Sequence, residues 1–85
     1  MRLDKYLKVS RLIKRRTVAN EACDGGRVMI NDRVAKASAE VKPGDVITIG
    51  FGNREVKVEV LRVAETVRKE EAAELFRYLT QESEK

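Results

Sequence analysis

Basic side chains recur at short, regular intervals near the start of the chain, and they are the groups best suited to chemistry. The series consists of Arg2, Lys5, Lys8, Arg11, Lys14, Arg15 and Arg16. Residues 1–36 contain ten basic and four acidic side chains, a net charge of +6, whereas residues 37–85 carry a net charge of −2. A module with one strongly basic region attracts a polyanion, and RNA and DNA are the commonest polyanions in a cell. The sequence therefore predicts nucleic-acid binding, against the alternative of a merely solvated helical face.

The candidate RNA-binding residues are cations of this region and one neighbouring hydroxyl. They are Arg2, Lys5, Lys8, Arg11, Lys14, Arg15, Arg16, Thr17 and Lys36. Structured RNA is recognised mainly through its shape, phosphates and 2′-hydroxyls, which suits a rigid array of cations. Arg2 and Arg16 rank first, because arginine can hold two phosphate oxygens in a planar fork. Thr17 could donate to the same phosphate or simply begin a helix. Tyr6 could stack on a base, but its spacing with Leu3 favours the core.

The residue types that are missing narrow the class of function. The chain has no histidine and only one cysteine. It therefore lacks the side chain that most often acts as a general base, and it lacks the ligands of most metal sites. Cys23 follows Ala19 and Ala22 at helical spacing, which favours a small buried hydrophobe over a reactive thiol. We expect no enzymatic activity and no cofactor. No apolar run has the length of a signal peptide or a membrane span, so we expect a cytoplasmic protein.

Short elements must position these residues, and their pattern predicts one small α+β domain. Apolar spacing predicts helices over residues 2–9 and 15–24, with Val18 among the inward residues of the second and Gly25-Gly26 ending it. Alternation predicts strands over 27–31, 33–35, 46–51 and 54–63. Asn31-Asp32, Pro43-Gly44 and Gly52-Asn53 predict the intervening turns. A C-terminal helix is expected from Val67 to about Gln81, with Thr66 as its N-cap, followed by a frayed end.

Four segments in this order resemble a known family. They are R-L-D-K-Y-L-K at 2–8, K-R-R-T-V-A at 14–19, G-G-R-V-M-I-N at 25–31 and V-K-P-G-D-V-I at 41–47. Together they are similar to the S-four RNA-binding domain, also called the alpha-L motif, over residues 2–49. The resemblance implies two short helices packed on a small antiparallel sheet, with a basic face that grips structured RNA. Residues 50–65 would then continue as a β-hairpin and residues 66–85 as the C-terminal helix and tail of a single domain.

The short length adds a second implication, because most members of this family carry the domain as an appendage of an enzyme. A stand-alone copy resembles the members that act in bacterial ribosome quality control and a related bacterial heat-shock protein. That resemblance implies binding to rRNA and to P-site peptidyl-tRNA on an obstructed large ribosomal subunit. It also implies support for C-terminal alanine tailing, with the tailing factor RqcH as a candidate partner. We expect the protein to be a monomer. The alternatives are a ribosome-biogenesis factor, a ribosomal protein, or a protein-interaction adaptor with a basic face.

Overall fold

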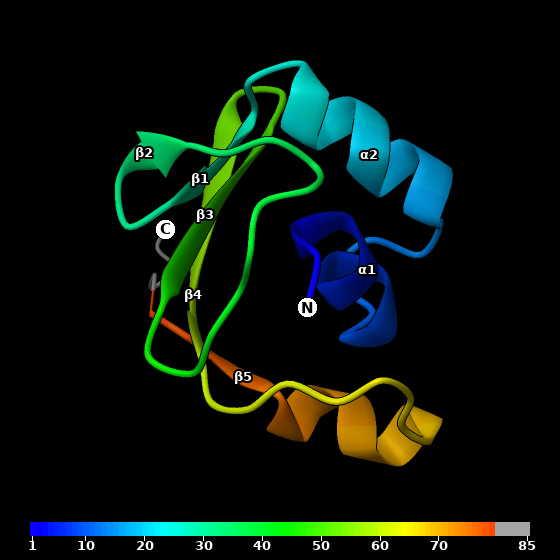
Figure 1. Ribbon diagram of the computed structural model, residues 1–85. Helices are drawn as coiled ribbons and strands as arrows, with labels where there is room; N and C mark the ends of the chain where they lie inside the picture. The colour runs from blue at the N-terminus through cyan, green and yellow to red at the C-terminus, as the bar shows by residue number, and fades with distance from the viewer. Residues whose placement is uncertain (80–85) are drawn as a thin grey trace.

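A computed structural model describes residues 1–79 of the protein (Figure 1). Two α-helices, one 3₁₀ helix and five strands make up the elements of this part of the chain. In chain order they are α1 (Leu3–Val9), α2 (Arg16–Asp24), β1 (Val28–Ile30), β2 (Arg33–Val34), β3 (Val46–Phe51), β4 (Arg54–Val60), η1 (Lys69–Glu74) and β5 (Phe76–Tyr78). The strands form one antiparallel sheet in the order β2-β1-β3-β4-β5. The expected α+β class, with helices packed on a small antiparallel sheet, is confirmed.

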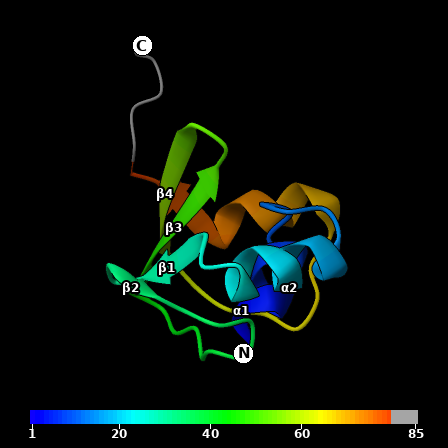
Figure 2. The same ribbon diagram turned by 90° about the horizontal axis from the view of Figure 1, so that it is seen from above.

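The helices α1, α2 and η1 lie on the same side of the sheet (Figure 2). The core between these layers consists of apolar side chains from both, and its fully buried members include Leu3, Tyr6, Leu7, Val28, Ile47, Ile49, Val58 and Leu75. Tyr6 belongs to this core, because its side chain is fully buried and its hydroxyl donates a hydrogen bond to the Leu75 carbonyl oxygen at 2.7 Å. The phenol thereby ties the first helix to the C-terminal segment, 69 residues later.

The turns follow the local chemistry of their residues. Asn31 and Asp32 have φ angles of 53° and 67°, and Ile30 pairs with Arg33 on either side. Positive φ at both central residues defines the hairpin turn that asparagine and aspartate tolerate best. Gly44 has a φ of 94°, and the Asp45 carboxylate accepts a hydrogen bond from the Lys42 amide at 3.0 Å. The predicted turns at these positions are therefore confirmed.

The C-terminal segment departs from the sequence-based expectation. The helix expected over 67–81 is instead the short 3₁₀ helix η1 followed by the strand β5, and Gln81 lies outside the described residues. Thr66 is not the N-cap, because Arg68 occupies that position and its amide donates to the Glu71 carboxylate. Leu75 ends η1 and Phe76 begins β5, and both side chains are buried. Pairing of β5 with β4 supplies interstrand hydrogen bonds that a helix could not make.

Smaller corrections concern the edges of the elements. The fourth strand ends at Val60 rather than at 63, because the chain turns there toward the helical layer. Val18 is 47% exposed, although Ala19, Ala22 and Cys23 of the same helix are buried as expected. A helix of nine residues presents only a narrow stripe to the core, and Val18 falls beside that stripe. Within residues 1–79 no helix has the length and apolar character needed to cross a membrane.

Candidate nucleic-acid interface

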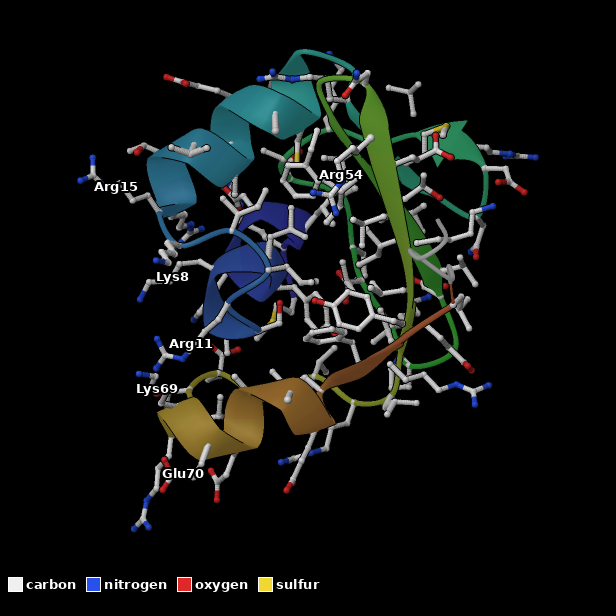
Figure 3. All side chains as sticks on the ribbon, turned by 180° about the vertical axis from the view of Figure 1, so that it is seen from behind. Lys8, Arg11, Arg15, Arg54, Lys69 and Glu70 are labelled. Carbon is white, nitrogen blue, oxygen red and sulfur yellow. The ribbon has the colours of Figure 1, made fainter. Side chains whose placement is uncertain are left out.

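The basic residues of the interface come from α1, from the loop that joins it to α2, and from the first turn of α2. Lys8, Arg11, Lys14 and Arg15 are all exposed, and their side chains have no hydrogen-bond or ion-pair partner within residues 1–79. Figure 3 shows Lys8, Arg11 and Arg15 along one side of the molecule. The structure thus brings together the middle of the predicted basic series as a row of uncompensated cations.

Arg2 and Arg16, the two residues ranked first, have a different environment. Both guanidinium groups contact the carboxylate of Asp4, which is almost fully buried between the two helices. Arg2 donates from Nε to Oδ1 at 3.1 Å and from Nη2 to Oδ2 at 3.3 Å, and Arg16 donates from Nη2 to Oδ1 at 3.4 Å. The amide of Asn20 donates to Oδ2 at 3.2 Å. Asp4, Arg2, Arg16 and Asn20 are called the Asp4 cluster below.

The Asp4 cluster supplies the hydrogen bonds and the opposite charges that a buried carboxylate requires. Burial acts to raise the pKa of Asp4, but the hydrogen bonds from Arg2, Asn20 and Arg16 outweigh it, and the pKa is lowered from its usual value. A buried charge is stable only when it is paired and hydrogen-bonded. The two arginine side chains remain about half exposed, at 51% and 47%. Each can therefore present one edge to solvent while the other edge is held by Asp4.

Asp4 lies in the first turn of α1, where an acid suits the positive end of the helix. Its carboxylate contacts Arg16 and Asn20 of α2 rather than Lys8, the basic residue one turn further along α1. The signal that could have indicated this is its position beside the buried Leu3 and Leu7, on the inner side of α1. An acid on that face must find donors from the element packed against it. Arg16 and Asn20, one turn apart on α2, supply them.

Lys5 is also paired, in its case with the C-terminal segment. Its ammonium group contacts the carboxylate of the exposed Glu65, 60 residues later in the chain. This hydrogen bond lowers the pKa of Glu65 from its usual value. The pair lies at a cavity of about 230 Å³ that Lys8, Arg11 and Arg16 also line. Glu65 therefore compensates part of the positive charge of that cavity.

The remaining predicted residues lie at the margins. Thr17 stands beside Arg16 in the first turn of α2 and, with Asp4 and Asn20, lines a cavity of about 400 Å³. Lys36 is exposed in the loop that crosses the start of α1, where the Asp4 amide donates to the Ala37 carbonyl oxygen at 3.1 Å. Cys23 is buried, and burial raises the pKa of its thiol to about 11, which fits the structural role expected for it.

One further cation of this surface, Lys69, lies outside the basic series that the sequence predicts. In the structure Lys69 begins η1 and lines a cavity of about 340 Å³ together with Lys8, Arg11 and Lys14. Figure 3 shows Lys69 on the side of η1 that faces Arg11, with Glu70 on the other side. No local pattern could indicate this, because more than 50 residues separate Lys69 from the others and only the fold joins them.

Comparison with known proteins identifies the family of the chain. Residues 1–47 match the S4 domain family, and the chain belongs to that family. Over 96% of its length it is 56% identical to the RQC P-site tRNA stabilizing factor of Bacillus subtilis, 95% of which is covered. It is 60% identical, over 89% of its length, to the protein of the same name from Halalkalibacterium halodurans, with 86% of that protein covered. The solved structure of Vibrio cholerae heat shock protein 15, described as trimeric, matches with a TM-score of 0.87 and 33% identity, covering 95% of this chain and 83% of that one.

Proposed function

We propose that the protein is a non-enzymatic RNA-binding factor of bacterial ribosome quality control. In this role it binds rRNA and P-site peptidyl-tRNA on the obstructed large ribosomal subunit, and it supports C-terminal alanine tailing of the stalled chain alongside RqcH. The observation that carries the proposal is the 56% identity, across nearly the whole of both chains, with a protein named for stabilising P-site tRNA. The S4 domain at residues 1–47 supplies the RNA-binding framework for it.

The physical character of the surface supports this function. Exposed cations on short helices can bind successive phosphates, whose spacing is fixed by the RNA backbone. The helices are held by a shared core and by the Asp4 cluster, so the backbone positions from which the cations extend are fixed. A rigid array loses less conformational entropy on binding than cations on a mobile loop would. Such a surface can hold a tRNA in place without acting on its covalent bonds.

The test is co-sedimentation with purified large ribosomal subunits that do or do not carry P-site peptidyl-tRNA. We expect retention on the subunits that carry it and much weaker retention on empty large subunits or on small subunits. Equal retention on empty and loaded subunits would instead favour a biogenesis factor or a ribosomal protein. Retention that survives ribonuclease treatment would favour a protein-interaction adaptor.

A charge-matched pair of variants makes the test specific to this surface. Lys14→Ala/Arg15→Ala removes two exposed cations of the interface, and Arg33→Ala/Lys42→Ala removes two exposed cations at β2 and the turn before β3. Both variants lower the formal charge from +4 to +2. The first should weaken retention strongly, while the second should behave nearly as the natural chain does. Equal losses would mean that net charge alone, rather than this surface, governs binding.

A further inference from the structure

We propose that the junction between α1 and η1 is a phosphate-binding site for the bound RNA, and that the C-terminal segment contributes Lys69 to it. This inference rests on the proposed function, since the phosphate belongs to the RNA on the large subunit. The site consists of Lys8, Arg11, Lys14 and Lys69 around one cavity of about 340 Å³. Three of these residues lie within the matched S4 domain, and the fourth lies 22 residues beyond its end.

The charge of this cavity is what points to an anion. Four cations line it, and none of their side chains has a hydrogen-bond or ion-pair partner among residues 1–79. The neighbouring cavity differs, because Glu65 pairs there with Lys5. Like charges around one hollow repel one another, most strongly at low salt, where ions screen exposed charges least. An oxygen-rich anion that enters the cavity removes this repulsion and gains charge-assisted hydrogen bonds.

The backbone at Arg11 gives a second, independent indication. Arg11 has a φ of 64°, which is the left-handed conformation. Helices commonly end with one residue in this conformation, and that residue is usually glycine. Its amide donates to the Lys8 carbonyl oxygen at 3.0 Å, which closes the end of α1. A residue with a side chain is strained in this conformation, and such strain concentrates at functional sites. An arginine here places a guanidinium group at the cavity, which glycine could not do.

The position of Lys69 is fixed by contacts of the segment that carries it. The Arg68 amide donates to the Glu71 carboxylate at 3.2 Å, and Leu75 at the end of η1 is fully buried. The Leu75 carbonyl oxygen accepts the hydrogen bond from Tyr6 of α1 at 2.7 Å. The same helix that supplies Lys8 thus also anchors η1, so the two lysines are held relative to one another. The C-terminal segment therefore contributes a side chain to the RNA-binding surface, in addition to its role in packing.

The experiment measures the affinity of fluorescently labelled protein for large ribosomal subunits that carry P-site tRNA, at fixed magnesium and several concentrations of monovalent salt. Lys69→Ala should weaken binding by about three- to tenfold and reduce the steepness of log affinity against log salt by about 0.7–0.9, as expected for one lost phosphate contact. Lys69→Arg should retain most of the affinity, because it keeps the charge. Lys42→Ala, the matched control on an exposed lysine outside the cavity, should leave both quantities unchanged.

A double variant tests whether the cations share one phosphate. If they do, Lys8→Ala/Lys69→Ala should lose less than the product of the two single losses, because removing the first partner already weakens the contact of the second. A multiplicative loss, or a Lys69→Ala variant that matches Lys42→Ala, would overturn the shared site. Failure of the proposed function looks different: the natural chain itself would then show no salt-dependent binding to the loaded subunit.

Discussion

Two groups of cations at α1 and its neighbouring segments differ in how their charge is used. In the Asp4 cluster, Arg2 and Arg16 share a buried carboxylate, so three charged groups carry a net charge of only +1. At the α1–η1 junction, Lys8, Arg11, Lys14 and Lys69 carry four positive charges, and the part of the chain that the structure describes supplies no acid to pair with them. Asp4 orients Arg2 and Arg16, whereas the positive charges of the junction are available to bind an anionic ligand.

This difference indicates a division of labour. Charges paired inside the protein stabilise the fold and fix geometry, so their loss should reduce stability together with binding. Charges left unpaired repel one another in the free protein, so their loss should reduce binding while sparing or improving stability. Substitutions that separate stability from RNA affinity can therefore test the comparison directly.

The largest effect on stability is expected from Asp4→Ala. Its loss leaves Arg2, Arg16 and Asn20 without their shared acceptor, but both arginines can turn toward water because they are half exposed. We expect a loss of about 2–3 kcal/mol in the free energy of unfolding, near the cost of leaving charged groups without their buried partner. Denaturant unfolding measures it. Glu21→Ala, on the exposed side of α2, is the control and should change stability by no more than about 0.5 kcal/mol.

The same carboxylate gives a prediction for pH. The pKa of Asp4 is lowered in the folded protein, so the folded state favours the ionised form more than the unfolded chain does. Its contribution is therefore fully present above the unfolded pKa of about 3.9 and is lost as the pH falls through the lower, folded pKa. The stability difference between the natural chain and Asp4→Asn should shrink over this acidic range. A difference that stays constant from neutral to strongly acidic pH would show that Asp4 acts only through its shape.

Arg16→Ala should affect both properties. It removes a charge-assisted contact to RNA, which we expect to cost about 1.5–3 kcal/mol of binding. Because Arg16 also donates to Asp4, it should in addition lower the free energy of unfolding by about 1 kcal/mol, more than an ordinary exposed arginine would. Arg16→Lys should restore part of each. Binding measured per folded molecule that stays at the natural level would remove Arg16 from the interface and leave it only a structural role.

Unlike the variants of the Asp4 cluster, Arg11→Gly should not lower the free energy of unfolding. Glycine relieves the left-handed strain at φ 64°, although it also gives the unfolded chain more freedom, so we expect a change between neutral and about 1 kcal/mol stabilising. RNA affinity should fall, because one guanidinium group of the α1–η1 junction is lost. Thermal unfolding and titration with large subunits on the same sample measure both. A variant that loses stability and affinity together would place Arg11 with the Asp4 cluster rather than with the junction.

The sequence predicted what depends on neighbours along the chain. The basic spacing from Arg2 to Arg16, the turn at Asn31-Asp32 and the burial of Tyr6 all follow from local pattern. It missed what depends on contacts between distant segments, namely the pairing of Asp4 with α2, the strand β5, and the arrival of Lys69 beside Lys8. Whether a cation is paired or unpaired is decided by such contacts. The sequence could therefore name the candidate cations but could not sort them into the two groups.

The smallest effect is expected at Glu65, which lies between the two groups. Its carboxylate pairs with Lys5 at the surface, and an exposed pair of this kind contributes little to stability because water screens it. Glu65→Gln should therefore leave unfolding nearly unchanged, while it frees Lys5 and removes one negative charge from the cavity beside Arg11 and Arg16. We expect affinity for large subunits carrying P-site tRNA to rise by about two- to fivefold at low salt and by less at high salt, because screening weakens such surface effects.

The control is Glu55→Gln, which makes the same change at an exposed glutamate of β4 on the hairpin far along the sheet. Equal gains from both variants would mean that affinity follows net charge alone. A gain confined to Glu65→Gln would show that the C-terminal segment affects RNA affinity in two ways. Lys69 adds a cation to the surface, and Glu65 pairs with Lys5 and so lowers its availability to RNA. A loss of affinity on Glu65→Gln would instead mean that the ion pair positions Lys5 for RNA. Lys5 would then belong with Arg2 and Arg16, as a cation whose direction the protein itself sets.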